Sequence, residues 1–483
     1  MEHFVNNYLQ NSSLQLSSGI IYEDLFNVIE KQEELDKPIL EQRWESKINQ
    51  IAKIVGDRGL ANEIADSIKQ LQTLYSGDII SWIANLYCPE NGGFYYSNSA
   101  RDNLGYLPDL ESTTQALGII GELFTIGFDG GWEDLLGEEM CAELVYFAKS
   151  KQDPNGYFYH PQWPRELTDS KPHRRGRDLN WATEILSWFG EQPTYDTPNG
   201  VCGNGILADG TAVSGFSHRE DVGVVAPKEE LVAPHLKDKE SFVAYLNGFD
   251  LKELSYPVSN TLEAQAKQIV IRDKVLKDMG ADYSLCDILV DWYAKHQDPT
   301  TGLFTFKAPN ATGLNGLMKS SSTVHEIQRP FPNALRGIES SITVIESDEP
   351  MGSVCCVMNP LCTINTLIAN IKMYGSGAEE TAKYKQYILE HAAEIIQATK
   401  NKILAFKKPD GSFSFSPDHS SVTSQGHPVA VLNTYEGDVN ATTIATSPTL
   451  GHLLAIIEAP KPPIFTVADT MRFFNIIEEK AGV

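Results

Sequence analysis

Three six-residue stretches, DLESTT from Asp109, DLNWAT from Asp178 and DVNATT from Asp438, repeat one pattern in this chain. Each has an acidic first residue, an aliphatic second residue, Glu or Asn in the third place, and Thr in the sixth. An Asp before a helix-like segment is a good N-cap, because its carboxylate accepts from free amides and favours the positive helix end. We therefore predict that each stretch opens a helix.

A second pattern is a turn of Pro, Asp or Asn, and Gly, with an aromatic residue after it. Its copies are CPENGGFYYS from Cys88, KQDPNGYFYH from Lys151, HQDPTTGLFTF from His296 and KPDGSFSFSP from Lys408. Proline fixes φ and glycine accepts positive φ, so the turn glycines are predicted to be Gly93, Gly156, Gly302 and Gly411. We expect the aromatic side chain to fill the gap between neighbouring helices.

The intervals between these glycines predict tandem helical hairpins, and strand-like alternation is scarce throughout. Two architectures fit such hairpins, an open solenoid and a closed ring of inner and outer helices. The interval from Gly156 to Gly302 is too long for one repeat, and its excess is a polar stretch rich in Gly and Pro. We interpret that stretch, residues 191–256, as an inserted loop or flap.

The turns QDPNGYF, HQDPTTGLF and KPDGSF resemble the Gln-x-x-x-Gly-aromatic turns of α/α-toroid proteins. Those proteins include terpenoid cyclases, protein prenyltransferases, and toroidal polysaccharide lyases and hydrolases. The resemblance implies an all-α (α/α)n toroid whose inner helices start at the rim that carries the cleft. We therefore expect an N-terminal helical segment over residues 1–85 and a toroidal catalytic domain over residues 86–470.

Composition narrows the function classes. The 483 residues include 39 Lys plus Arg and 64 Asp plus Glu, a formal net charge of −25 that disfavours nucleic acid and anionic membranes as partners. No apolar run is long enough to cross a bilayer, and the start MEHFVNNYLQNSSLQ lacks a signal-peptide pattern, so we expect a cytoplasmic protein. Seven scattered cysteines without a C-x-x-C pair predict buried thiols rather than disulfides or a zinc site.

A basic cluster directly precedes the second motif copy, in the stretch SKPHRRGRDLNW from Ser170. Guanidinium groups bind carboxylate, sulfate or phosphate with two parallel hydrogen bonds. The alternative is a solvated loop whose charges pair with local acids such as Asp169 and Asp178. The residues expected to bind an anionic substrate are His173, Arg174, Arg175 and Arg177.

Further candidates lie in three stretches: NGYFYHPQW from Asn155, SSSTVHEIQRPFPN from Ser320, and HSSVTSQGHPVAVLNTYEGDVNATT from His419. Aromatic side chains stack on sugar rings, while His and Tyr exchange protons. The alternatives are core packing for the aromatic residues and helix capping for the residues in the third motif position. The catalytic candidates are Tyr159, His160, Asn180, His325 and Tyr435, and the further substrate-binding candidates are Glu111, Trp163, Arg329, His427 and Asn440.

Motifs of other chemistries are missing from the sequence. We find no P-loop, dinucleotide glycine pattern, H-E-x-x-H or G-x-S-x-G. DLEST resembles the Asp-x-Asp-Asp motif of class II terpenoid cyclases only in part, since Glu111 and Ser112 replace its last two aspartates. The zinc ligands of protein prenyltransferases have no clear counterpart either. We expect no metal or other cofactor, although carboxylates alone would suffice to hold calcium.

We therefore expect a carbohydrate-active enzyme that cleaves an acidic, uronic-acid-containing oligosaccharide by β-elimination. That reaction needs a cation or amide beside the sugar carboxylate, a base and an acid. The sequence offers Arg174, Arg175 or Arg177 with Asn180 as neutraliser, His160 or His325 as base, and Tyr159 or Tyr435 as acid.

Three alternatives stay open. A glycoside hydrolase on the same fold would use two carboxylates, for which the candidates are Asp102, Glu111, Glu436 and Asp438. A terpenoid-cyclase-like enzyme would need an apolar cavity, and a non-catalytic helical-repeat scaffold would need none. The sugar, the linkage and the oligomeric state are not set by the sequence.

Overall fold

The computed structural model describes residues 22–124, 131–216, 229, 232–375, 378–459 and 461–481. Helices dominate these residues, and each strand is only two residues long, which confirms the all-α prediction. The toroid stays a prediction. The predicted N-terminal segment and the predicted flap extend into residues 1–21 and 217–231, which lie outside the described ranges except for residue 229.

The chain divides into two units by contact. Unit 1 comprises residues 1–147, 385–424 and 428–483, and unit 2 comprises residues 148–384 and 425–427. The short second segment of unit 2 is therefore flanked in the sequence by residues of unit 1. The expected domain boundaries stay predictions.

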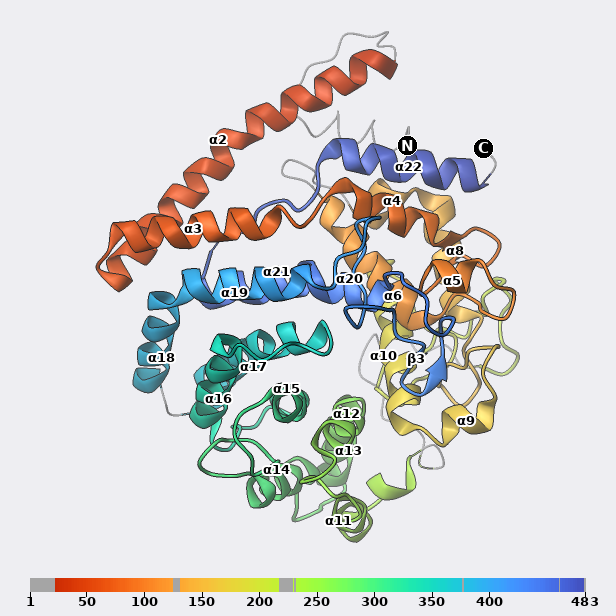
Figure 1. Cartoon of the computed structure of the whole chain (residues 1–483). Coiled ribbons are helices and arrows are strands. Elements are labelled where there is room, and N and C mark those ends of the chain that lie inside the picture. The colour runs from red at the N-terminus through yellow and green to blue at the C-terminus, as the bar shows by residue number, and fades with distance from the viewer. Residues whose placement is uncertain are drawn as a thin grey trace. The chain divides into compact units, whose positions relative to one another are not determined.

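Unit 1 is built largely from helices, of which α22 lies along α4 and α3 contacts both α2 and α19 (Figure 1). In α3, Asp57 accepts a hydrogen bond from the Leu60 amide, and the buried side chains recur at helical spacing. The elements are α2 (Tyr22–Val55), α3 (Arg58–Gln72), α4 (Gly77–Asn85), β1 (Tyr87–Cys88), β2 (Gly93–Phe94), α5 (Asn98–Arg101), α6 (Leu110–Ile120), η1 (Gly121–Leu123), α7 (Trp132–Leu136), α8 (Glu138–Lys149), α19 (Ala392–Leu404), β3 (Thr423–Ser424), β4 (His427–Pro428), α20 (Val439–Ala445), α21 (Ser447–Ile457) and α22 (Val467–Ala481).

In unit 2, α12, α15 and α17 lie side by side, with α16 against α17 (Figure 1). The small residue Gly316 lets α15 approach α12 closely, because an added Cβ there would meet Ser255 at 2.6 Å. The elements are α9 (Arg165–Asp169), α10 (Pro172–Trp188), η3 (Pro234–Leu236), α11 (Lys239–Asn247), α12 (Ser255–Glu263), α13 (Ala266–Asp278), α14 (Leu285–His296), α15 (Ala311–Glu326), α16 (Ala334–Glu346), α17 (Cys355–Tyr374) and α18 (Ala378–Glu390). The last residues of α18 belong to unit 1, whereas the last two residues of α8 and His427 of β4 belong to unit 2.

The predicted turns share one backbone arrangement. Gly156, Gly302 and Gly411 have φ values of 83°, 72° and 88°, which only glycine adopts without strain. In the first copy the left-handed residue is Gly92, with φ of 70°, and Gly93 pairs instead with Cys88 in a short ladder. The assignment of Gly93 was therefore wrong, because two adjacent glycines permit either position. The aromatic side chains that follow are fully buried, as expected: Phe94, Phe158, Phe304 and Phe413.

A further copy of this turn lies inside the stretch that we interpreted as a flap. Ile206 pairs with Ala212 as Gln152 pairs with Phe158, and Gly210 takes the left-handed conformation. Asp209 accepts a hydrogen bond from the Thr211 amide at 2.9 Å. The copy escaped notice because no aromatic residue follows its glycine. The same stretch also contains η3 and α11.

The six-letter motif connects the turn to the helix in unit 1. Asp109 and Asp438 cap α6 and α20 by accepting from the amides of Ser112 and Ala441, as predicted. The fifth residue of each copy is a Thr that accepts a hydrogen bond from a turn aromatic: Thr113 from Phe94, and Thr442 from Phe413, each at 3.0 Å.

The prediction that Asp178 opens a helix was wrong. The helix α10 begins earlier, with Pro172 in its first turn, where the missing amide hydrogen of proline carries no penalty. Asp178 thus lies within the helix, and Ala182 stands where the other copies have the turn-binding Thr.

Candidate functional site

Unit 2 contains most of the predicted site residues. Around Trp163, the rings of His160 and His427 lie with centroid distances of 4.3 and 4.7 Å, and the Arg174 guanidinium lies 5.0 Å from the Trp163 ring. All four side chains are buried. This cluster packs like a core, so the role of its members as direct substrate ligands stays a prediction.

Arg174 pairs with Asp178 one helical turn along α10. Its Nε donates to Asp178 Oδ2 at 2.9 Å, and a second guanidinium nitrogen donates to the other carboxylate oxygen. Both side chains are almost completely inaccessible to solvent. A buried ion pair of this kind keeps both charges satisfied, and separating it leaves an uncompensated charge.

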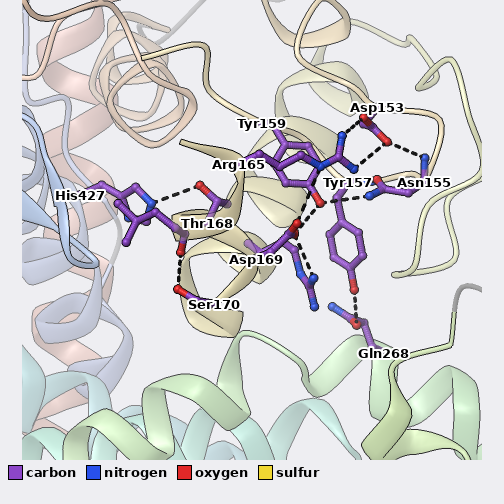
Figure 2. Close-up of polar contacts among 12 residues, drawn as sticks. Asp153, Asn155, Tyr157, Tyr159, Arg165, Thr168, Asp169, Ser170, Gln268 and His427 are labelled. Carbon is purple, nitrogen blue, oxygen red and sulfur yellow. Dashed lines mark hydrogen bonds and ion pairs between the residues drawn. The ribbon is translucent and has the colours of Figure 1, made fainter. Parts of the chain in front are cut away.

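Residues 425–427, the short second segment of unit 2, contact the residues around Trp163 and α10. Lys171 Nζ donates to the Gly426 carbonyl at 2.9 Å, and Asn260 Nδ2 donates to Gln425 Oε1 at 2.8 Å. Thr168 Oγ1 lies 3.1 Å from His427 Nε2 (Figure 2). Burial lowers the pKa of His427 to about 4, and the positive charges of Arg174 and Lys171 act in the same direction. His427 is therefore neutral at pH 7.

Next along α10, Arg175 lies in a more accessible network of aromatic and charged side chains. Its guanidinium is 4.4 Å from the Tyr157 ring centroid, and it donates to Asp169 Oδ1 at 3.2 Å. The Tyr159 hydroxyl donates to the same carboxylate oxygen at 2.8 Å, and Arg165 lies over the Tyr159 ring at 4.4 Å (Figure 2). The Arg175 side chain is 23% exposed, so part of its charge is available to a ligand.

Three residues that sequence reasoning missed form a hydrogen-bonded group in this unit: His235, Tyr245 and Gln265. The rings of His235 and Tyr245 stack with centroids 4.0 Å apart and an interplanar angle of 22°. Gln265 joins them, since its Oε1 lies 2.7 Å from His235 Nε2 and its Nε2 donates to the Tyr245 hydroxyl at 3.0 Å. No motif marks them, because they come from η3, α11 and the start of α13.

The hydrogen bonds of Gln265 determine the tautomer of His235. Gln265 Nε2 uses its two hydrogens on Tyr245 and on the Thr261 carbonyl, so Oε1 must accept. His235 Nε2 therefore carries the proton, and Nδ1 carries the lone pair. Burial lowers the pKa of His235, and the nearby positive charge of Arg175 lowers it further. The imidazole is neutral and suited to accept a proton at Nδ1.

Tyr245 complements this base. Burial raises its pKa, while the hydrogen bond from Gln265 and the charge of Arg175 oppose that rise. The hydroxyl accepts from Gln265 and keeps its own hydrogen to donate. Close by in the sequence, Gln268 accepts a hydrogen bond at 3.2 Å from Tyr157 (Figure 2). The ring of Tyr157 carries the Arg175 guanidinium on its face. The arrangement thus combines a cation, a neutral base and a proton donor.

The remaining predicted residues of unit 2 lie in other contacts. His173 Nε2 is 3.3 Å from the Gln425 carbonyl, and Arg177 donates to Asn260 Oδ1 at 3.3 Å. Asn180 Oδ1 accepts from Asn199 at 3.2 Å. His325, in the last turn of α15, lies against the ring of Tyr374, and Arg329 forms an ion pair with Asp287.

Unit 1 contains the other three predicted residues. Glu111 is buried and accepts a hydrogen bond from Ser424 at 2.6 Å, while Asn440 is half-buried in the first turn of α20. Tyr435 is exposed and lines a pocket of about 580 Å³ together with Asp102 and Glu436.

Asp438, the residue directly before the first turn of α20, is completely buried in unit 1. Burial raises its pKa to about 6, although amide donors and the Tyr96 hydroxyl act in the opposite direction. This carboxyl group accepts from the amides of Ala441 and Phe415 at 2.7 and 2.9 Å. Its position therefore makes it a helix cap.

No protein-family model, curated protein or solved structure matches this chain. Within the described ranges, no three His, Cys, Asp or Glu side chains gather in a metal-binding arrangement. No helix in those ranges combines the length and apolar character needed to cross a membrane.

Proposed function

We propose that this protein is a lyase that cleaves uronic-acid-containing oligosaccharides by β-elimination, at the group formed by Arg175, His235, Tyr245 and Gln265. The proposal rests on one observation: a neutral His with a fixed tautomer is stacked on a Tyr and lies within the electrostatic reach of a partly exposed Arg. The expected toroid and a cytoplasmic location belong to the same proposal. No disulfide joins the seven cysteines, all within the described residues, which favours a reducing compartment.

Arg175 is proposed to neutralise the sugar carboxylate. Loss of the C5 proton moves negative charge into that carboxylate, and a guanidinium beside it stabilises the charge as it develops. Asp169 and Tyr157 hold the Arg175 side chain from two directions, so little motion is needed to bind the anion. Arg174 is unsuited to this role, since it is buried and paired with Asp178.

The proton transfers follow from the tautomer. His235 Nδ1 takes the C5 proton, the electrons of the C5–H bond form a C4–C5 double bond, and the C4–O bond breaks. Tyr245 gives its proton to the departing oxygen, and proton exchange with water restores both residues. Gln265 acts as a positioning residue, since it fixes which imidazole nitrogen carries the lone pair.

Hydrolysis is the weaker alternative. Of its four candidate carboxylates, Glu111, Glu436 and Asp438 are buried and accept hydrogen bonds from protein groups. Asp102 is exposed but pairs with Arg101, which lowers its pKa and disfavours a role as general acid. A hydrolase needs one carboxyl that stays protonated near the bond and a second to activate water or attack.

The test is a screen of the full-length protein against galacturonate, mannuronate and glucuronate oligosaccharides, with near-ultraviolet absorbance and reducing ends followed together. Elimination gives one absorbing double bond per new reducing end. Replacement His235→Ala should lower kcat by about 10² to 10⁴-fold, because a positioned general base supplies that much. Arg175→Ala should also lower kcat/KM strongly.

Two control variants separate chemistry from folding. His296→Ala removes a half-buried histidine that bonds the Trp292 carbonyl, and Arg336→Ala removes an exposed arginine paired with Glu339. Both belong to unit 2 but not to the proposed group, and both should keep wild-type rates. Reducing ends that form without absorbance would replace elimination with hydrolysis, and absence of any cleavage would refute both.

A further inference from the structure

The pocket in unit 1 is built from three segments that the sequence separates widely. Residues of α5 and its C-terminal turn form one wall, the turn at Gly411 forms a second, and residues 431–436 form the third. Its volume of about 580 Å³ falls within the range of small-molecule sites. The polar and aromatic groups that line it include Asn98, Asp102, Asn103, Asp410, Thr434 and Tyr435.

The floor of this pocket is fixed by hydrogen bonds. Glu436 is buried, and its carboxylate accepts from Ser97, Ser420 and both the amide and hydroxyl of Ser99, at 2.5 to 3.2 Å. The Val431 amide donates to the Ser99 hydroxyl at 3.1 Å. The pocket is therefore formed before any ligand arrives, which lowers the cost of binding.

The Tyr435 ring offers one free face. Lys408 is buried and donates to the Pro417 carbonyl at 2.7 Å, which holds its ammonium 4.4 Å from the ring centroid. Tyr435 itself is 65% exposed. A flat, accessible aromatic face beside polar groups suits a sugar ring, whose C–H face packs on it while its hydroxyls form hydrogen bonds.

Charge selects the kind of sugar. The carboxylates of Asp102, Asp410 and Glu436 outnumber the Lys408 ammonium among the lining residues, so an anionic ligand such as a uronate is disfavoured here. The ring already carries the Lys408 ammonium on one face, which weakens its attraction for a cationic ligand on the other. A neutral sugar avoids both penalties.

We propose that this pocket of unit 1 binds a neutral sugar residue of an oligosaccharide, stacked on Tyr435, with hydroxyls bound by Asp410 and Asn103. Asp410 is available for this because its Oδ1 accepts from the Ser412 amide and hydroxyl, while Oδ2 has a single long contact of 3.5 Å with Asn98 within the described residues. The site is independent of the elimination chemistry proposed for unit 2.

The experiment measures binding by the full-length protein with saturation-transfer NMR and calorimetry. The probes are cellotriose, maltotriose and xylotriose as neutral sugars, trigalacturonate as an anion and fully deacetylated chitotriose as a cation. We expect at least one neutral trisaccharide to bind, and Tyr435→Ala to weaken it roughly tenfold through loss of the stacking surface. Asp410→Asn should weaken it roughly threefold by replacing a charged acceptor with a neutral one.

Matched controls make the result specific. Asp410→Asn preserves the turn, since Asn155 makes the same bond to the residue two places later in the unit 2 copy. Tyr146→Ala removes a different tyrosine of unit 1, 53% exposed and outside the pocket, and should change nothing. The proposal is overturned if no neutral trisaccharide binds, if Tyr146→Ala weakens binding as much as Tyr435→Ala, or if Tyr435→Ala abolishes binding of trigalacturonate or chitotriose.

The result is separable from the proposed lyase activity. Trigalacturonate binding that survives Tyr435→Ala and disappears with Arg175→Ala belongs to the unit 2 group. Failure of elimination leaves the neutral-sugar site standing, because its readout is binding and needs no turnover.

Discussion

The turn at Gly156 in unit 2 and the turn at Gly411 in unit 1 have the same backbone and opposite surroundings. In each, an Asx side chain accepts from the amide two residues later, and a Phe beyond the glycine is fully buried. Around the first turn lie the cations of Arg165 and Arg175. The pocket beside the second is lined by three carboxylates and one ammonium group, that of Lys408.

This difference shows that the repeated turn determines the local backbone but not which kind of ligand is bound beside it. The glycine and the buried Phe are used up by the turn itself, and the Asx residue commits one side-chain oxygen to it. The side chains between them and on neighbouring segments are free to vary, and they determine whether an anion or a neutral molecule is favoured. Burial also shifts the pKa of one group in each unit. It lowers the pKa of His427 in unit 2 to about 4 and raises that of Asp438 in unit 1 to about 6, because it disfavours the charged form of both.

The largest expected effect concerns His427. Its pKa is lowered to about 4 in the folded protein from 6.5, so the folded state favours the neutral ring. Its contribution to stability is fully present above pH 6.5 and is lost as the pH falls towards 4, by an amount on the order of 3 kcal/mol. Calorimetric unfolding of the wild type and His427→Gln between pH 4 and 7 measures it.

The variant should lose part of this acid destabilisation, because Gln does not titrate. His391→Gln, at a more exposed histidine of unit 1, is the control and should follow the wild-type curve within about 0.5 kcal/mol. If His427→Gln and the wild type respond to pH in parallel, the ring of His427 is not held neutral by its surroundings.

Asp438 should respond with the opposite sign. Its pKa is raised to about 6 from 3.8, so the folded state disfavours the charged form. Its contribution is fully present below pH 3.8 and is lost as the pH rises through 6, by roughly 2 to 3 kcal/mol. The free energy of unfolding of the wild type minus that of Asp438→Asn should therefore fall between pH 4 and 6.

The comparison with Asp109→Asn tests whether this behaviour is particular to one cap. Asp109 holds the same motif position at α6 and also accepts from a helix amide. Asn caps a helix about as well as Asp, so both variants keep their cap and differ from the wild type chiefly in losing a titratable group. A difference curve for Asp438→Asn that stays flat over this range would contradict the raised pKa.

The sequence allowed the turns and two helix starts to be predicted because local chemistry alone determines them. Positive φ demands Gly156, Gly302 and Gly411 whatever surrounds them, and a carboxylate before a helix caps it. Before Asp178 the sequence has a second local signal for a helix start, Pro172, and α10 begins there instead.

The candidate site was less predictable, because it depends on contacts between distant segments. Arg174 and Asp178 stand four apart on α10 and pair inside the unit, whereas the neighbouring Arg175 points to a different face and keeps some exposure. Pairing with Asp178 had been the alternative interpretation, but as part of a solvated loop rather than inside a helix. His235, Tyr245 and Gln265 had no shared pattern, and only the fold brings them together.

The smallest expected effect tests the scaffold that both turns share. Thr113 and Thr442 occupy the fifth motif position and each accept a hydrogen bond from a buried amide, those of Phe94 and Phe413. Thr113→Val and Thr442→Val keep the shape but leave these amides unpaired, at a cost of about 1 to 2 kcal/mol each. Thr73→Val, at an exposed threonine that ends α3, should cost less than 0.5 kcal/mol. Denaturant unfolding measures all three. Similar losses for the two motif variants would mean that the fifth-position Thr joins turn to helix in both copies, and a loss confined to one would mean that the likeness of the two copies is one of sequence only.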